Sequence, residues 1–190
     1  AMPDAYLSVT EALRHACARC GVQPRIDLVN AEEITPDTAE ELLGGYDAIV
    51  APGGFGDRGV DGMIVAARYA RERGVPFLAI GFGMQLAVVE AARSLLGIAD
   101  AHTAEADPLT AHPVVRVPED RICQNDSRAA TRMGSSGVRL LDGELRRIYG
   151  AEVVAERHSN RYEVDPAYVP DLERKGLRLA GVSMEAGYPE

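Results

Sequence analysis

The sequence predicts an α/β fold in which helices lie on both faces of a mostly parallel sheet. Strand-like and helix-like segments alternate along the first hundred residues, as they do in parallel α/β proteins. Residues 75–80 form a short continuous apolar run, which is typical of a strand buried on both faces. Glycine-rich turns follow two of the predicted strands, at the carboxyl edge where ligands collect in such sheets.

The first half of the chain supplies most of these elements. Ser8 or Thr10 is expected to begin a helix that ends at Gly21. Apolar spacing and glycine positions then predict strands over 25–29, 46–51 and 75–80, and helices over 59–73 and 84–96. Residues 38–43 are not expected to be all helix because Gly44 follows at once, although a short helix at 42–43 should pack under the sheet.

The second half is less regular. Residues 106–136 are rich in Asp, Pro, Ser and Gly, so we expect loops there around one strand at 114–117. A short helix is predicted over 144–149, with strands over 152–155 and 177–182. Without a linker or repeat, residues 1–190 are expected to form one domain.

Composition narrows the class of function. A net charge of -9 argues against nucleic acid or an anionic membrane as a partner, because both require a clustered basic face. No apolar run is long enough to cross a bilayer, and no leader is recognisable. Three cysteines fit a reducing compartment, so a cytoplasmic location is expected.

Cofactor and metal sites are not indicated. Cys17 and Cys20 form a Cys-x-x-Cys at the carboxyl end of a predicted helix, where the dipole does not activate a thiol, so helix packing explains them best. The four histidines lack ligand spacing, and no phosphate-binding loop with its lysine is present. We expect neither a metal nor a cofactor.

The most informative feature is a strand-to-helix elbow at residues 79–85. Gly81 and Gly83 flank the bulky Phe82 between the strand over 75–80 and the following helix. Hydrolases place a strained Ser or Cys at such an elbow, because the side chain projects above the sheet and the next amide can stabilise an oxyanion. Gly81 can adopt the backbone shape but offers no attacking atom.

Several segments together resemble one family. They are residues 4–9 (DAYLSV) with 11–13 (EAL), 52–56 (PGGFG) with 58–59 (RG), 69–72 (YARE), 83–85 (GMQ), 156–158 (ERH) and 161–164 (RYEV). The combination resembles the glutaminase domain of CTP synthase, a class I glutamine amidotransferase, from about residue 4 to about residue 183. The resemblance implies a flavodoxin-like, three-layer fold and a pocket for glutamine.

The resemblance also implies roles for particular residues. Gly54 and Phe82 would supply the two oxyanion amides. Gln85 and Glu105 would hold the substrate glutamine, Arg161 with Tyr162 would receive its α-carboxylate, and Phe55 would lie against it. This set suits an amino-acid zwitterion, whose ammonium group needs an acidic partner and whose carboxylate needs the paired N–H donors of an arginine.

The sequence departs from the family where catalysis occurs. Gly81 replaces the cysteine nucleophile, and Ser159 and Asn160 replace a basic pair. The family's first sheet strand and its closing His-Pro-Glu motif, which supplies the general base and its orienting acid, have no counterpart in residues 1–190. Without these groups the thioester route to ammonia has no nucleophile.

Other residues could in principle replace the missing catalytic groups. Cys123 and His158 are weak candidates for a Cys-His pair, although a nucleophile away from the elbow would lose the preformed oxyanion site. Glu156 and Glu163 could act as acid and base, but a surface position on a strand explains each equally well.

Four interpretations therefore follow from the sequence. The first is a glutaminase-dead domain that still binds a small amide, an amino acid such as glutamine, or an anion. The second is an enzyme with altered chemistry in the same pocket. The third is an interaction or regulatory module of an ATP-dependent synthetase, and the fourth is a deliberately disabled form of an active amidotransferase. The sequence does not predict an oligomeric state.

Overall fold

Helices and short strands alternate in the first half of the chain, and longer antiparallel strands fill the second. The computed structural model describes residues 3–121 and 131–190. Its helices are α1 (Leu7–Arg19), α2 (Ala39–Leu43), α3 (Val60–Arg73), α4 (Phe82–Leu95), α5 (Gly143–Tyr149) and α6 (Val169–Arg174). Its strands are β1 (Ile49–Ala51), β2 (Phe77–Ala79), β3 (Ala101–Thr103), β4 (His112–Arg116), β5 (Arg132–Leu140), β6 (Val153–Asn160), β7 (Glu163–Val164) and β8 (Gly181–Ser183). The predicted α/β class is confirmed.

The strands form three ladders. β1 pairs with β2 in parallel. β4 pairs with β3 in parallel on one side and with β7 antiparallel on the other. The third ladder has the order β6-β5-β8 and is antiparallel throughout. Parallel pairing thus holds where the βα pattern predicted it, and the antiparallel ladder belongs to the less regular second half.

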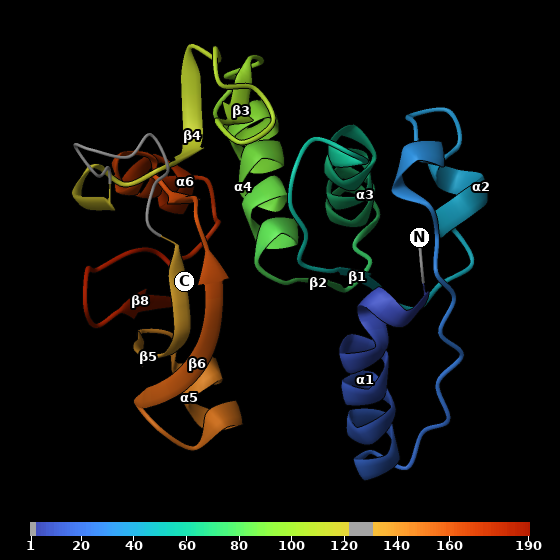
Figure 1. Cartoon of the computed structure of the whole chain (residues 1–190). Coiled ribbons are helices and arrows are strands. Elements are labelled where there is room, and N and C mark those ends of the chain that lie inside the picture. The colour runs from blue at the N-terminus through green and yellow to red at the C-terminus, as the bar shows by residue number, and fades with distance from the viewer. Residues whose placement is uncertain (1–2, 122–130) are drawn as a thin grey trace.

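Helix α4 is the centre of the core. Its residues Leu86, Val89 and Ala92 are fully buried, and they pack with α3, β3, β4 and β7. In Figure 1, α3 and α4 stand side by side above β1 and β2, and α1 extends away below them. The buried Glu90 accepts a hydrogen bond from Arg71 Nη2 (2.8 Å), which joins α4 to α3.

Two of the predicted strands need correction. Residues 25–29 are extended but form no strand, because no described segment pairs with them. Of the strand predicted over 177–182, only the end is observed, as β8. Extended, half-apolar residues become a strand only beside a neighbour, and the local sequence does not reveal that neighbour.

Residues 106–136 also differ from the prediction. β5 begins at Arg132 inside the predicted loop region, because eight of its residues pair with β6. Its Gly134 and Gly137 have low strand propensity, which the tertiary pairing overrides. The strands β3 and β7 and the helix α6 were not predicted. Helix α2 fills nearly all of residues 38–43, which were expected to be only partly helical, because Gly44 caps the helix and does not interrupt it. The predicted helices over 59–73, 84–96 and 144–149, and the one ending at Gly21, are confirmed within a few residues.

No helix in the described part of the chain is both long and apolar enough to span a membrane.

Candidate functional site

The elbow places Gly81 at the junction of β2 and α4. Gly81 has φ 53° and ψ -112° and is the N-cap of α4. A Cβ built on it would have Gly53 Cα, at 3.9 Å, as its nearest neighbour outside the adjacent residues. The backbone thus has the strained shape of a nucleophile elbow, and the space for a side chain is open.

Gly83 has a different function in the same elbow. A Cβ there would lie 2.3 Å from the carbonyl oxygen of Ala51. The first turn of α4 therefore approaches β1 more closely than any other residue type would permit. This close approach fixes Gly81 beside the glycine turn, which we define as residues 52–56.

The glycine turn brings the two predicted oxyanion residues together. A Cβ on Gly54 would lie 3.5 Å from Phe82 Cδ1, so the two residues are neighbours. Within the part of the chain that the structure describes, neither amide donates a hydrogen bond. Two free N–H groups beside an open position can receive a developing negative charge.

Glu105 is hydrogen-bonded to the glycine turn. Its Oε1 accepts a hydrogen bond from the Gly56 amide at 2.7 Å. Burial raises the pKa of Glu105 above the usual 4.5, while the Gly56 amide and the charge of Arg161 act in the opposite direction. The carboxylate of Glu105 therefore lies against the glycine turn, and the positive charge of Arg161 acts on it.

Gln85 and the Arg161–Tyr162 segment form the opposite side. Gln85 is buried on α4 and donates through Nε2 to the carbonyl oxygen of Tyr162 at 2.8 Å. Arg161 Nε is buried and has no hydrogen-bond partner among the described residues. A buried guanidinium N–H without an acceptor is costly, and a bound carboxylate would satisfy it.

Phe55, in contrast, is largely solvent-exposed, at 69% of its surface. The seven residues that the resemblance implies for the substrate therefore lie on four neighbouring segments: the glycine turn, the start of α4, the Glu105 turn and the turn between β6 and β7.

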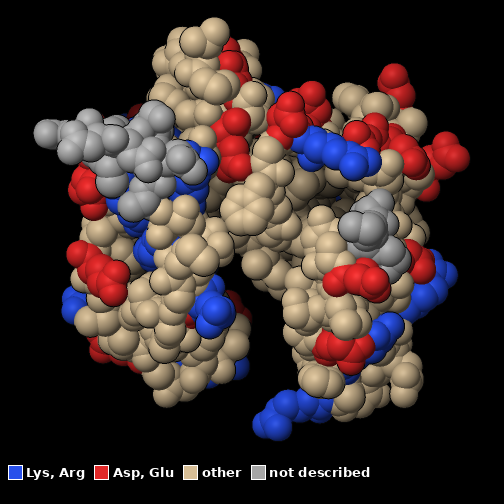
Figure 2. Space-filling model, viewed as in Figure 1, with Lys and Arg blue, Asp and Glu red and all other residues tan. Residues whose placement is uncertain are grey.

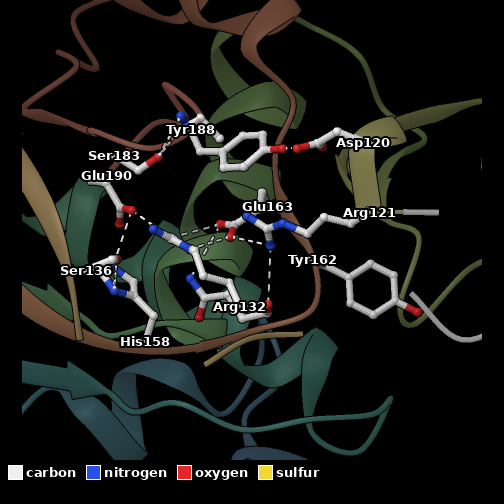
Figure 3. Close-up of polar contacts among 12 residues, drawn as sticks. Asp120, Arg121, Arg132, Ser136, His158, Tyr162, Glu163, Ser183, Tyr188 and Glu190 are labelled. Atoms are coloured by element: carbon white, nitrogen blue, oxygen red, sulfur yellow. Dashed lines mark hydrogen bonds and ion pairs between the residues drawn. The ribbon is translucent and has the colours of Figure 1, made fainter. Parts of the chain in front are cut away.

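The weak candidate His158 lies elsewhere in the hydrogen-bond network. Its Nδ1 is 3.0 Å from Ser136 Oγ, and its Nε2 is 3.3 Å from Glu190 Oε1 (Figure 3). No hydrogen bond or ion pair of the described residues joins it to the elbow. Cys123, the other candidate, is outside the described residues.

A buried group of ionic side chains adjoins the Arg161–Tyr162 turn, because Glu163 follows Tyr162 directly. We call Arg121, Arg132, Glu163 and Glu190 the Arg–Glu cluster. Glu163 Oε1 accepts hydrogen bonds from Arg121 Nη1 and Arg132 Nε, both at 3.0 Å, and Arg132 Nη2 donates to Glu190 at 2.6 Å (Figure 3). The ring of Tyr162 points away from the cluster.

The cluster corrects one prediction and adds residues that the sequence did not suggest. Glu163 is only 2% exposed, so a surface strand position does not explain it. Arg121 and Arg132 were missed because their partner is about 30 to 40 residues away, and no local spacing signals such a pair. No group of three potential metal ligands gathers within residues 3–121 and 131–190.

Comparisons with known proteins identify the family of this chain. The family described as "Glutamine amidotransferase class-I" matches residues 1–189. CTP synthase of Pelotomaculum thermopropionicum is 46% identical over 188 residues, which cover 98% of this chain and 35% of that protein. CTP synthase of Methanopyrus kandleri is 49% identical over 187 residues, 96% of this chain and 35% of that protein. The chain thus spans about a third of the length of these relatives.

A solved structure has the same fold. It is described as the glutaminase domain of Trypanosoma brucei CTP synthase with bound acivicin, and it superposes with a TM-score of 0.89 at 36% identity. The match covers 95% of this chain and 70% of the other. From its fold and its sequence, the chain belongs to the class I glutamine amidotransferase family and is similar within it to the glutaminase domain of CTP synthase.

Proposed function

We propose that this protein binds glutamine, or a similar small amide or amino acid, without hydrolysing it. The observation that carries the proposal is the open position above Gly81, beside two amides that have no partner among the described residues. A ligand carbonyl placed there would accept hydrogen bonds from Gly54 and Phe82.

The charges around the elbow suit the two ends of an amino acid. Arg161 offers a buried Nε–H that a carboxylate can accept, and Glu105 offers a carboxylate for an ammonium group. Both are proposed as binding residues, together with Phe55, Gln85 and Tyr162.

Hydrolysis is not expected, because the elbow carries no nucleophile. Loss of a catalytic nucleophile lowers the rate by several powers of ten, even when the rest of the site remains. His158 does not offer a replacement base here, since its polar contacts are with Ser136 and Glu190. An enzyme with altered chemistry in this pocket is therefore less well supported than a binding protein.

Glutamine titration provides the test. By calorimetry we expect saturable 1:1 binding, with ammonia release at background. Arg161→Ala should weaken binding at least about 30-fold, because a carboxylate loses its charged partner. Arg157→Ala, at an exposed position on β6, is the matched control and should leave the affinity unchanged. No binding by the unaltered protein, or equal affinity of both variants, would contradict the proposal.

Binding should also depend on pH through Glu105. Burial raises the pKa of Glu105, so as the pH falls its carboxylate becomes protonated at a higher pH than an ordinary glutamate would. We expect affinity to fall as the pH is lowered from about 7.5 to about 5. The folded state binds this proton more tightly than the unfolded chain, so protonation of Glu105 favours the fold and does not cause unfolding.

Glu105→Gln separates charge from shape in that experiment. The amide oxygen can still accept from the Gly56 N–H, whereas the charge is gone. We expect weaker binding at neutral pH and a flat profile in calorimetric titrations across the same range. A profile as steep as that of the unaltered protein would assign the pH dependence to another group.

A partnership with an ATP-dependent synthetase is a second candidate. It is favoured by the length of the relatives, since this chain matches only about a third of each CTP synthase. Such a partner, in the cytoplasm, would make the domain a regulatory module. Co-purification from cells with an ATP-binding ligase would support it, and recovery of the protein without such a ligase would count against it.

A further inference from the structure

The turn that carries Arg161 joins two of the three ladders. Asn160 ends β6, which pairs with β5, whereas Glu163 begins β7, which pairs with β4. Arg161 and Tyr162 lie between these strands and belong to neither ladder. The position of the Arg161 guanidinium therefore depends on how the ends of β6 and β7 are held together.

One side chain crosses this junction. Arg121 Nη1 donates to the carbonyl oxygen of Asn160 at 3.4 Å and to Glu163 Oε1 at 3.0 Å (Figure 3). The first contact is with the end of β6 and the second with the start of β7. A terminal guanidinium nitrogen carries more than one N–H donor, so this single nitrogen ties both ends of the turn.

Arg121 is itself held in place from another side. Its guanidinium carbon lies 4.6 Å from the centre of the Tyr188 ring, and the Tyr188 hydroxyl donates to Asp120 (Figure 3). Figure 2 shows charged side chains of both signs on the outer surface, where water screens them. The Arg121 side chain is only 12% exposed, so its contacts are screened much less.

From these contacts we infer that Arg121 is a positioning residue for Arg161. It acts through the turn, because it holds β6 and β7 together while Gln85 holds the Tyr162 carbonyl from α4 at 2.8 Å. The buried Nε of Arg161 is thereby kept where a carboxylate can accept from it.

Arg121 therefore sets how strongly the site prefers a ligand with a free α-carboxylate. A charged hydrogen bond weakens steeply when its distance or angle changes, so a small shift of the turn removes much of the preference. The inference rests on the proposed function, in which Arg161 receives the carboxylate of an amino acid.

Calorimetry with L-glutamine and L-glutaminamide tests the inference, since glutaminamide has an amide in place of the α-carboxylate. We expect the unaltered protein to bind glutamine at least about 30-fold more tightly than glutaminamide. Arg121→Met should reduce this ratio to under about fivefold, because methionine replaces the apolar stem but has no N–H donor. Glu163 keeps Arg132 as a partner, so no buried carboxylate is left alone.

Arg116→Met is the matched control. Arg116 also pairs with a largely buried carboxylate, donating through Nε to Asp165 at 2.5 Å, and none of its side-chain hydrogen bonds among the described residues reaches the turn. A merely structural role would affect both variants alike, whereas only Arg121→Met should lose the ligand preference. Sucrose, which favours folded states, is added to every sample if either variant is partly unfolded.

Tyr188 provides a second, milder test. Tyr188→Leu removes the ring beside the Arg121 guanidinium and should lower the ratio about threefold. Tyr188→Phe keeps the ring, loses only the hydrogen bond to Asp120 and should leave the ratio unchanged. Equal ratios in these two variants would contradict the inference, even if Arg121→Met could not be obtained in folded form.

The outcomes separate this inference from the proposed function. An unchanged ratio in Arg121→Met, or an equal loss in Arg116→Met, would overturn the inference and leave glutamine binding as proposed. Equal affinity of the unaltered protein for the two ligands would overturn it as well, since Arg161 would then not receive a carboxylate. Absence of glutamine binding by the unaltered protein would contradict both.

Discussion

Glu163→Gln should lower the free energy of unfolding by about 3–5 kcal/mol, the usual cost of removing one partner of a buried ion pair. Glu163 is 2% exposed and accepts hydrogen bonds from Arg121 and Arg132, whose side chains are 12% and 8% exposed. Glutamine preserves the shape but leaves Arg132 with Glu190 as its carboxylate partner and leaves Arg121 with no carboxylate in the cluster. Urea denaturation followed by circular dichroism measures the change.

Glu144→Gln is the control for this substitution. Glu144 pairs with Arg147 on α5, and both side chains are more than half exposed. Solvent screens such a pair, so the expected loss is under about 0.5 kcal/mol. If both variants lost a similar, small amount, the Arg–Glu cluster would not be a stabilising feature of the fold.

The cluster also bears on the proposed ligand site. Glu163 follows Tyr162 directly, and the carbonyl of Tyr162 is held by Gln85. The cluster therefore supports the turn that presents Arg161. Arg161→Ala should weaken ligand binding with little change in the free energy of unfolding. Glu163→Gln should mainly lower the free energy of unfolding.

The elbow could be predicted from sequence because its signals are local. Gly81 and Gly83 stand directly between an apolar run and a helical pattern, and the geometry required at each is a property of a few adjacent residues. The glycine turn was predicted for the same reason. The family resemblance then supplied Glu105 and Arg161, which no local pattern connects to the elbow.

The antiparallel ladder and the Arg–Glu cluster could not be predicted in this way. β5 carries glycines and serines that favour loops, and it is a strand because β6 and β8 pair with it. Residues 25–29 have strand-like composition but no partner in the described chain. In both cases the decisive contact is distant in sequence, so composition favoured the wrong state.

Gly81→Cys should create a thiol that iodoacetamide labels about tenfold faster at neutral pH than an ordinary exposed cysteine. The N-terminus of α4 and the free amide of Phe82 favour the thiolate, which lowers the pKa of the thiol. The position has room, since the new Cβ would lie 3.9 Å from Gly53 Cα. The positive φ should cost about 1–3 kcal/mol of stability.

Gly45→Cys provides the reference rate. Gly45 is exposed, and a Cβ there would meet no atom within 4 Å, so its thiol reports ordinary reactivity. Peptide mass spectrometry distinguishes either new thiol from Cys17 and Cys20. Equal rates at the two introduced positions would mean that the elbow does not activate a nucleophile.

Glutamine extends the same experiment to the proposed pocket. A ligand carbonyl held by the Gly54 and Phe82 amides would lie over residue 81 and shield a thiol there. We therefore expect glutamine to slow alkylation of Gly81→Cys and not of Gly45→Cys, and the protection to disappear when Arg161→Ala is added. Sustained ammonia release is still not expected, because a thiolate alone lacks the general base that completes turnover. Protection from alkylation without ammonia release would show that the site binds glutamine although it does not hydrolyse it.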